Sequence, residues 1–442
     1  SSHRLSRARA AGVRPSIQWS ARSRRGARTQ ATGGDASVPV SPGVRRGPSP
    51  REPVTPPLPG SPRGENQKEN NSGSMAWANQ LWKQYDPINN IIFPKMGARP
   101  TYDDRGKPFV GELQVRDVIY KTVMVSLPVL VPGGLCAPPK LIECPLLCVF
   151  RADAKRLQKC KGKGCVVYLH GNGTDIGGAS EEAKTLAREL DCHVLVPEYP
   201  GYGRAEGIAN EDTVDAVTHA TIRFAVETLS VPHDRLVLYG RSVGTGPAAA
   251  AASRMTLTSP LGPPAALVLH SPYTSIYEFA KEKAGGLLSY LLVSERWPTR
   301  VNLTRTGCPV LLIHGDKDEV IPFRHSAKLR KDAAKRSTAH AARNFGDRND
   351  TKQGDGQFRH GTKGGAAGVV QLHVQKGASH NVFDFYGDVA DPIASFLERH
   401  ERAPFAKGGA SLDEMGLDLQ NLDTRLAEVG PGEAEEYPFA NG

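Results

Sequence analysis

The sequence predicts a domain in which α-helices cover both faces of a mostly parallel β-sheet. Between about residues 110 and 402, short apolar runs alternate with segments of helical pattern. Most of these runs are apolar at odd and even positions alike, which is typical of strands buried on both faces. Regular alternation of strands and helices favours parallel pairing with crossover helices. The strand-like runs are PLLCVF, CVVYLH, HVLVPEY, RLVLYG, ALVLHS, PVLLIHG and VVQLHVQ.

Three segments between these runs have helical character. Residues 180–190, SEEAKTLAREL, begin with Ser180 and carry Glu182 in the first turn, a combination that favours a helix start. Residues 212–229 and the alanine-rich run after Gly244 are the other two. The run VMVSLPVLVPGGL is broken by Pro and Gly and predicts a strand and a turn. Because no apolar run approaches the roughly 18 residues of a membrane span, we expect no transmembrane helix.

The net charge of +10 lies almost entirely in residues 1–74, which contain 13 of the 56 Lys and Arg and 4 of the 46 Asp and Glu. The rest of the chain is nearly neutral, so it gives no argument for a nucleic-acid partner. Residues 1–74 are rich in Arg, Ser, Pro and Gly, and we expect a disordered arm. Its first 34 residues have eight arginines and no acid, a composition resembling a mitochondrial or plastid transit peptide. The alternative is that Met75 is the true start and the upstream residues are untranslated sequence read through.

Composition also suggests the remaining boundaries. Residues 75–108 form an extended lead-in whose two tryptophans we expect to pack on the body rather than touch a membrane. Residues 109–402 form the α/β domain. Within it, residues 331–368 are polar and Gly-rich, and we expect a disordered insertion between the last two strands. Residues 403–442 form an acidic tail, in which the pattern allows a short docked helix.

Seven cysteines indicate reduced thiols rather than a disulfide framework. The count is odd and the spacing irregular, which fits an intracellular compartment. Four of them cluster in sequence without a C-x-x-C pair, so we expect buried thiols and no zinc site. No other pattern calls for a metal or cofactor. The cysteines are Cys136, Cys144, Cys148, Cys160, Cys165, Cys192 and Cys308.

The run LVLYGRSVGTGPAAAAAS, residues 236–253, predicts a nucleophile elbow. A strand leads into Gly240, Ser242 and Gly244, and a small-residue helix follows. In such an elbow the serine lies at the apex of a strained turn, and the residues two before and two after it must be small because they come close together. The helix N-terminus then favours negative charge at the serine.

The run CVVYLHGNGTDIGG predicts the second half of an oxyanion hole. A strand that ends in His-Gly at a loop is typical of the segment that supplies one backbone amide, and we expect the amides of Asn172 and Val243 to form the hole. The alternative is a phosphate-binding turn built on the glycines after the strand, with Glu198 near the place of the ribose-binding acid. The glycine spacing G-x-G-x-x-x-G is one residue off the dinucleotide pattern.

The acid and the base are expected after the last two strands, where site residues of parallel sheets gather. PVLLIHGDKDEVIPF offers two aspartates, and we favour Asp318 over Asp316 because Asp316 is better placed to serve the turn itself. VVQLHVQKGASHNVFDF offers His380 in a Gly-flanked loop, whereas His373 lies in the strand and is expected to be packed. The chain order Ser242, Asp318, His380 is the order of triads built on this elbow, so the sequence predicts a serine hydrolase.

From about residue 92 to 400 the chain resembles the α/β-hydrolase superfamily, and within it the alpha/beta hydrolase domain-containing protein 17 group. The segments that carry the resemblance are FPKMGARPTY, LHGNGTDIGG, PEYPGYGRAEG, LYGRSVGTGPA, LVLHSPYTSI, CPVLLIHGDKDEVIPFRHS and GASHN. The resemblance implies Ser242 as nucleophile, Asp318 as acid and His380 as base. Animal members are depalmitoylases, which implies an acylated protein or lipid-like ester as substrate, peripheral membrane contact, and a cytoplasmic or membrane-associated location.

The chain departs from that group in lacking a lipidation signal. No cysteine precedes Cys136, and Met75 is followed by Ala rather than Gly. Residues 274–307 take the place of a short cap, and their run AGGLLSYLLV either lines an acyl channel or forms an ordinary packed helix. Two alternatives therefore stay open beside a palmitoyl-thioesterase: a serine peptidase or small-ester carboxylesterase with the same triad, and a non-enzymatic protein tethered by its basic arm. The sequence leaves the oligomeric state undetermined.

Overall fold

The computed structural model describes residues 92–93, 99–133, 138–153, 156–160, 164–259, 262–284, 295–334 and 369–400, all within the compact unit Ser72–Gly442. The predicted arm 1–74, most of the lead-in, the tail 403–442 and residues 335–368 of the insertion lie outside the described residues. So does nearly all of the predicted cap run at 284–293.

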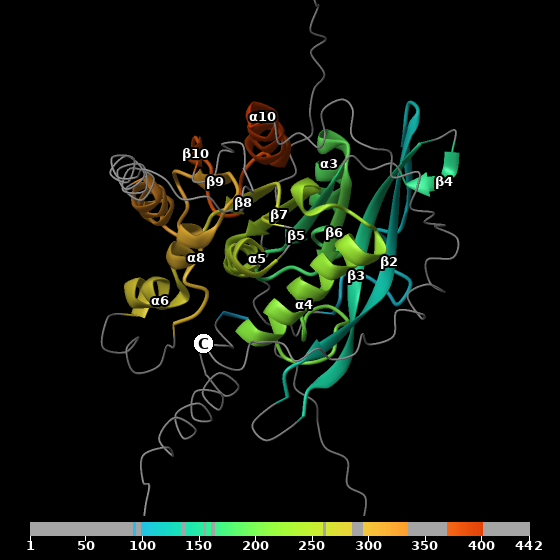
Figure 1. Cartoon of the computed structure of the whole chain (residues 1–442), viewed down its shortest axis with the longest axis horizontal. Helices are drawn as coiled ribbons and strands as arrows, with labels where there is room; N and C mark the ends of the chain where they lie inside the picture. Colours follow the sequence, from blue (N-terminus) through green and yellow to red (C-terminus); the bar gives the residue numbers. More distant parts are fainter. Residues whose placement is uncertain are drawn as a thin grey trace, which may run out of the picture. The chain divides into compact units, whose positions relative to one another are not determined.

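A ten-stranded sheet forms the centre of the described region (Figure 1). The strands are β1 (Gly111–Val115), β2 (Val118–Val131), β3 (Lys140–Asp153), β4 (Arg156–Cys160), β5 (Cys165–Leu169), β6 (His193–Pro197), β7 (Leu236–Arg241), β8 (Ala266–His270), β9 (Val310–Gly315) and β10 (Val370–Gln375). Their order is β1-β2-β3-β6-β5-β7-β8-β9-β10, and β4 pairs with β3.

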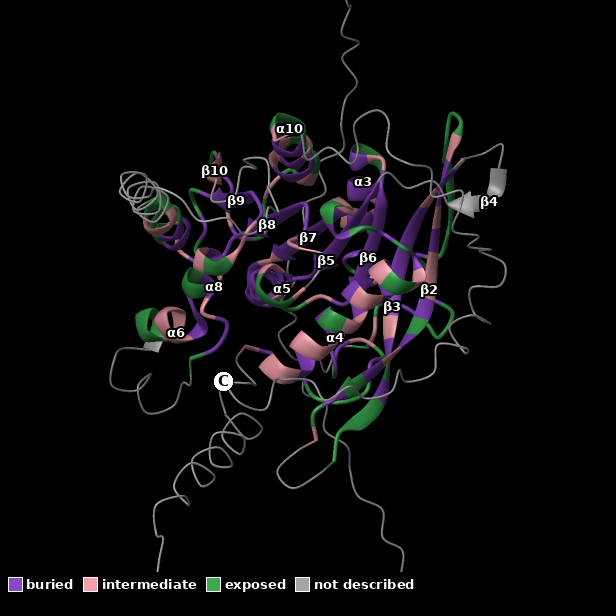
Figure 2. Cartoon of the chain, in the orientation of Figure 1, coloured by how far each residue is buried: buried purple, intermediate pink, exposed green. Residues whose placement is uncertain are grey.

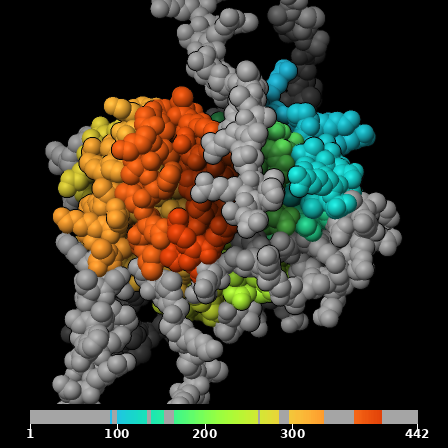
Figure 3. Space-filling view, turned by 90° about the horizontal axis from the view of Figure 1, so that it is seen from above, coloured from blue at the N-terminus to red at the C-terminus, as the bar shows by residue number. Residues whose placement is uncertain are grey.

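The sheet is parallel from β6 to β10 and antiparallel at the β1–β3 end. Each of the seven strand-like runs lies in β3 or in one of β5–β10, so the predicted fold class is confirmed. The expected strand at VMVSLPVLVPGGL lies in β2 as far as Val131, whereas the residues of the expected turn from 134 onward lie outside the described residues. Figure 3 shows the two edges of the sheet on opposite sides of one face, with cyan residues of the β1–β2 end facing orange and red residues of the β10 end.

Helices cover both faces of the sheet. They are α3 (Ser180–Leu190), α4 (Glu211–Arg223), α5 (Thr245–Thr258), α6 (Ile276–Ala284), α8 (Thr299–Arg305) and α10 (Asp391–Arg399). In β5, Cys165 and Val167 pack in one apolar cluster with α4 and α5, whereas Val166 and Tyr168 pack in a second cluster with α3 and α10. This alternation buries the central strands on both sides, as their purple colour in Figure 2 shows.

Local details differ from the sequence expectations in two helices. Helix α3 begins at Ser180 as predicted, but its N-cap is Ala179 and no side chain caps it. The segment 212–229 is α4 followed by a π-helical turn, Phe224–Thr228, rather than one continuous α-helix. Among the described residues no helix is both long and apolar enough to cross a membrane.

The segment 331–368, expected to be a disordered insertion, starts with helical residues. Residues 324–334 are helical, so the first four residues of the segment 331–368 belong to this helix. Its side chains at His325, Ser326 and Leu329 are buried, which anchors the helix to the body before the polar residues begin.

Trp297 lies near the end of the predicted cap, residues 274–307, and joins it to helices α4 and α5. Its side chain is 1% exposed. Its backbone N–H donates to Glu211 Oε1 at 2.8 Å and its indole Nε1–H donates to Asp215 Oδ1 at 2.8 Å. Its ring packs so closely on Gly246 of α5 that a Cβ there would overlap it. One side chain thus joins α4, α5 and the end of the cap.

We predict that Trp297→Ala lowers the free energy of unfolding by about 3–5 kcal/mol, because it leaves a large cavity. Trp297→Phe keeps most of the packing but loses the bond to Asp215, and is expected to cost about 1–3 kcal/mol. Urea denaturation measures both. The control is Leu257→Ala on the exposed side of α5, where the side chain is 61% exposed. Equal stabilities of Trp297→Ala and this control would contradict the assignment.

Candidate active site

Ser242 lies at the sharp turn between β7 and α5, in a backbone conformation that non-glycine residues rarely adopt. Its φ is +51°. A Cβ on Gly240 would overlap the carbonyl of Gly244, and a Cβ on Gly244 would overlap the carbonyl of Leu169 at the end of β5. Both glycines of the predicted elbow are therefore required by close backbone contacts.

The helix behind the elbow points its N-terminus at Ser242. A short 3-10 turn, Ser242–Gly244, leads directly into α5, and Thr245 donates its hydroxyl to the Ser242 carbonyl at 2.6 Å. Residues 248–252, all alanine, are buried. The partial positive charge of the helix N-terminus favours a negative charge at Ser242 Oγ.

The structure brings Ser242, Asp318 and His380 together in one hydrogen-bonded chain. His380 Nδ1 lies 2.8 Å from Asp318 Oδ2, and His380 Nε2 lies 3.1 Å from Ser242 Oγ. Since an ionised carboxylate can only accept, Nδ1 carries the proton and Nε2 is left to accept the Ser242 hydroxyl proton. All three residues are less than 10% exposed.

Asp318 is held ionised by its surroundings. Its Oδ1 accepts the backbone N–H groups of Val320 at 2.9 Å and Ile321 at 2.8 Å. Its Oδ2 lies 3.3 Å from Nε2 of the buried His314. Burial alone would raise the pKa of the Asp318 carboxyl, but the hydrogen bonds from His314, His380 and the Ile321 backbone outweigh it and hold the pKa well below its usual range.

Asp316, the alternative acid, makes a hydrogen bond that stabilises the turn after β9. Its Oδ1 accepts the Gly377 N–H at 2.7 Å, which ties the loop after β9 to the loop after β10. A Cβ on Gly315 would overlap the carbonyl of Ala378, so the two loops also meet along their backbones. Of the two aspartates, Asp318 therefore contacts His380 and Asp316 contacts the backbone of the neighbouring loop.

Two side chains that the sequence analysis did not single out hold the His380 loop. Arg241, next to the predicted nucleophile, donates from Nη2 to the His380 carbonyl and to Asn381 Oδ1, each at 3.3 Å, and its guanidinium lies 5.1 Å from the ring centre of Phe383. Glu319 Oε2 accepts the His380 backbone N–H at 3.3 Å. The sequence could have pointed to these two residues, because Arg241 directly precedes Ser242 and Glu319 directly follows Asp318.

The loop after β5 lies against the elbow, where the predicted oxyanion amides belong. A Cβ on Gly171 would lie 3.6 Å from the Ser242 Cβ. Asn172 follows Gly171 and is exposed, and its Oδ1 accepts the Tyr202 hydroxyl at 2.9 Å. Val243 directly follows Ser242 in the first turn of the elbow. The two predicted donors therefore belong to two separate segments that meet at Ser242.

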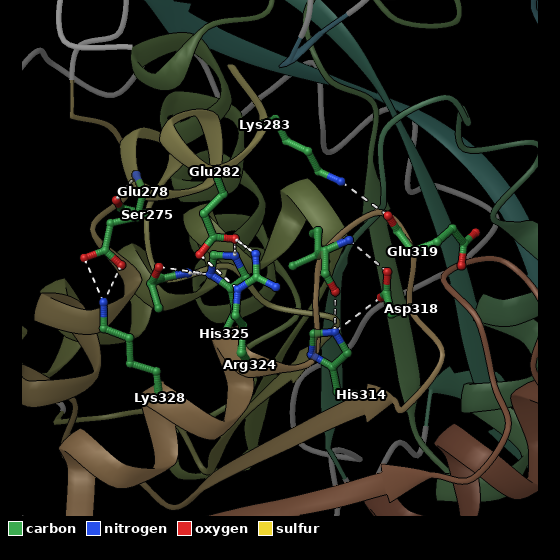
Figure 4. Close-up of polar contacts among 12 residues, drawn as sticks. Ser275, Glu278, Glu282, Lys283, His314, Asp318, Glu319, Arg324, His325 and Lys328 are labelled. Atoms are coloured by element: carbon green, nitrogen blue, oxygen red, sulfur yellow. Dashed lines mark hydrogen bonds and ion pairs between the residues drawn. The ribbon is translucent and has the colours of Figure 1, made fainter. Parts of the chain in front are cut away.

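Helix α6, at the start of the cap, is tied to the helix that follows the acid loop (Figure 4). Glu282 Oε2 lies 2.6 Å from Arg324 Nη2 and 3.1 Å from His325 Nε2. The buried His325 accepts the Thr274 N–H at Nδ1, at 3.2 Å, so its Nε2 carries the proton that Glu282 accepts. This contact joins both ends of the Thr274–α6 segment to residues 324–334.

Further polar contacts continue this connection toward the triad (Figure 4). Glu278 binds Lys328 at 2.9 Å, and Lys283 Nζ donates to the Glu319 carbonyl at 3.3 Å. Glu319 in turn accepts from His380 with its side chain. The described part of the cap therefore rests on the same loop that carries the acid of the triad.

The described residues include no group of three or more His, Cys, Asp or Glu that could hold a metal ion. Cys144, Cys148 and Cys165 are buried, and the positions of Cys136 and the side chain of Cys160 lie outside the description. Glu198, the acid of the alternative phosphate site, is wholly buried. It accepts from the Tyr102 hydroxyl and from the Ile176 N–H, so its carboxylate lies in the protein interior.

No family model matches the chain, but curated relatives do. It is 32% identical over 169 residues to the alpha/beta hydrolase domain-containing protein aho-3 of Caenorhabditis elegans, covering 37% of this chain and 46% of that protein. It is 29% identical over 167 residues to the human domain-containing protein 17B, covering 38% and 54%. The chain thus spans about half the length of the curated relatives it matches.

Solved esterases are similar at low identity. The Pyrococcus furiosus esterase Pf2001 is 12% identical with a TM-score of 0.43 and covers 69% of this chain and 99% of that structure. Est1E of Butyrivibrio proteoclasticus is 14% identical with a TM-score of 0.41 and covers 64% and 99%.

The sheet, the elbow and the curated relatives place the chain in the α/β-hydrolase superfamily. Within that superfamily it resembles the domain-containing protein 17 group distantly.

We predict that the stability contributed by the Asp318 contacts depends on pH in the direction set by its lowered pKa. The contribution is fully present above the ordinary carboxyl pKa of about 4 and is lost as pH falls further toward the lowered value. Urea denaturation of the wild type and Asp318→Asn, repeated at several pH values, measures it. The stability difference between the two proteins should shrink in acid. A difference that stays constant from neutral pH to about pH 3 would contradict the assignment.

Proposed function

We propose that the protein is a serine hydrolase that cleaves acyl esters or thioesters, with Ser242 as nucleophile, His380 as general base and Asp318 as the acid that orients it. The observation that carries the proposal is the hydrogen-bonded chain from Asp318 Oδ2 through His380 to Ser242 Oγ, with distances of 2.8 and 3.1 Å. The strained backbone at Ser242 and the lowered pKa of Asp318 also support the proposal, because a serine that only packs in the structure needs neither of them.

The reaction proceeds in two steps. His380 Nε2 takes the Ser242 proton as Oγ attacks the acyl carbonyl, and the amides of Asn172 and Val243 stabilise the oxyanion. The proton then passes from His380 to the leaving alkoxide or thiolate as the carbon–oxygen or carbon–sulfur bond breaks. Water, deprotonated by His380, attacks the acyl-enzyme, and the proton returns to Ser242 as the acid is released.

Apolar side chains beside the triad support a substrate with an apolar acyl group. Val320 and Val382 lie two residues after Asp318 and His380, and they are 37% and 72% exposed. Both follow the carboxyl ends of parallel strands, at the edge where the triad lies. Together with the resemblance to depalmitoylases, they favour a long-chain acyl thioester on a protein as the substrate, with the acyl chain presented from a membrane surface.

We predict that the protein hydrolyses a long-chain acyl thioester and that Ser242→Ala lowers kcat by roughly 10⁴-fold or more. Release of free thiol from palmitoyl-coenzyme A or a palmitoylated peptide measures the rate. The matched control is Ser379→Ala, which removes a hydroxyl from the neighbouring loop and leaves the triad side chains in place.

Two other outcomes are informative. Hydrolysis of short esters or peptides but not of long-chain thioesters, still lost in Ser242→Ala, would keep the serine hydrolase and replace the substrate by that of a carboxylesterase or peptidase. Equal rates for the wild type and Ser242→Ala on every acyl substrate would overturn the proposed function.

A further inference from the structure

A buried histidine and a buried glutamate meet beneath the loop that carries Asn172. His170 and Glu198 are each 0% exposed, and His170 Nε2 lies 3.4 Å from Glu198 Oε1. Within the part of the chain that the structure describes, neither of these two atoms has a hydrogen-bond partner. The triad chemistry uses neither residue, so the pair requires its own explanation.

The other side of the His170 ring fixes where its proton lies. His170 Nδ1 is 3.0 Å from the Gly171 carbonyl. A carbonyl can only accept, so Nδ1 carries a proton. Nε2 and Glu198 Oε1 would then be two acceptors facing each other unless one further proton lies between them. The pair therefore consists of an imidazolium and a carboxylate, or of an imidazole and a carboxylic acid, and in both forms Nδ1 remains a donor.

The acceptor of that Nδ1 proton belongs to the peptide that carries the oxyanion donor. The Gly171 carbonyl and the Asn172 N–H are the two ends of one planar unit, and in a trans peptide they point in opposite directions. A hydrogen bond that draws the carbonyl toward the buried His170 turns the Asn172 N–H away from it. It also polarises the amide, which strengthens the N–H as a donor.

We propose that His170 and Glu198 are positioning residues that orient and polarise the Gly171–Asn172 peptide for oxyanion stabilisation. The inference rests on the proposed function, because it assigns a role within the same acyl-transfer site.

The segment that carries Glu198 braces the same loop at three further points. Tyr199 donates its hydroxyl to the His170 carbonyl at 2.9 Å and stacks on the imidazole with ring centres 4.1 Å apart. Tyr202 donates to Asn172 Oδ1 at 2.9 Å. Glu198 Oε2 accepts the Ile176 N–H at 3.2 Å. These contacts hold the loop in place, but none of them involves the Gly171 carbonyl. The hydrogen bond from His170 Nδ1 therefore sets the orientation of the Gly171–Asn172 peptide.

The first test compares two substitutions of His170. His170→Phe keeps a ring against Tyr199 but removes the Nδ1 donor, whereas His170→Asn keeps an amide N–H close to the place of Nδ1. For acyl-ester hydrolysis we expect His170→Phe to lower kcat about 10-fold or more with KM changed less than about 3-fold, because an oxyanion donor acts in the transition state. His170→Asn should recover part of kcat. The control is His373→Phe, the same change on β10.

A second readout separates oxyanion stabilisation from a general loss of structure. A trifluoromethyl ketone adds to Ser242 and places a charged oxygen in the hole, so its inhibition constant should rise in His170→Phe by the factor by which kcat/KM falls. The inhibition constant of a simple ground-state competitor should not rise. Folding is checked by circular dichroism for each variant.

A second pair of variants decides the matter if His170→Phe does not fold. In Glu198→Gln the amide N–H donates to His170 Nε2 and preserves the Nδ1–H form, and kcat should stay within about 3-fold of the wild type. Glu198→Met fills similar space without a hydrogen bond and should lower kcat as His170→Phe does.

Unchanged kcat in His170→Phe, or equal kcat in Glu198→Gln and Glu198→Met, would overturn the inference while the Ser242-dependent activity stands. Absence of Ser242-dependent activity in the wild type would instead overturn the proposed function, and the inference would fall with it.

Discussion

The close approach of the backbones at Ser242 is the constraint on which the rest of the site depends. Gly240 and Gly244 leave no room for a Cβ, and the carbonyl of Leu169 lies where one on Gly244 would be. This approach strains Ser242 to a φ of +51°. It also sets the end of β5, and hence the Gly171–Asn172 loop, directly beside Ser242. The elbow and the oxyanion loop are therefore parts of one packing arrangement.

Hydrogen bonds and charged groups hold the residues around the elbow in place. Asp318 is kept ionised by backbone N–H groups and by His314, which fixes the tautomer of His380. The loop that carries His380 is held from both sides, by Arg241 beside the nucleophile and by Glu319 beside the acid. Arg241 and Glu319, which are the sequence neighbours of Ser242 and Asp318, thus hold the loop of His380 in place. The described part of the cap contacts the same Asp318 loop through Lys283.

Sequence predicted the central strands well because burial on both faces leaves an unambiguous apolar pattern, as in β5 and β9. It also singled out Ser242, Asp318 and His380, since each follows a strand in a recognisable context, and the structure places their side chains in one hydrogen-bonded chain. Contacts between residues far apart in the chain could not be predicted from the sequence. Arg241 and His380 are 139 residues apart in the chain, and nothing local signals their contact. The antiparallel pairing of β1, β2 and β3 was not specified by the sequence, because pairing direction depends on the connections and not on the strand pattern. The helical residues 331–334 were missed because the buried side chains that anchor this helix, His325, Ser326 and Leu329, precede them in the sequence.

Reaction of the protein with a fluorophosphonate, followed by mass spectrometry of the adduct, tests the central claim most directly. The account predicts one phosphonylated residue, Ser242, with labelling slowed severely in His380→Ala and abolished in Ser242→Ala. The control Ser379→Ala should label at the wild-type rate. Labelling that persists in Ser242→Ala, or a wild-type protein that does not react while remaining folded, would contradict the assignment of Ser242 as an activated nucleophile.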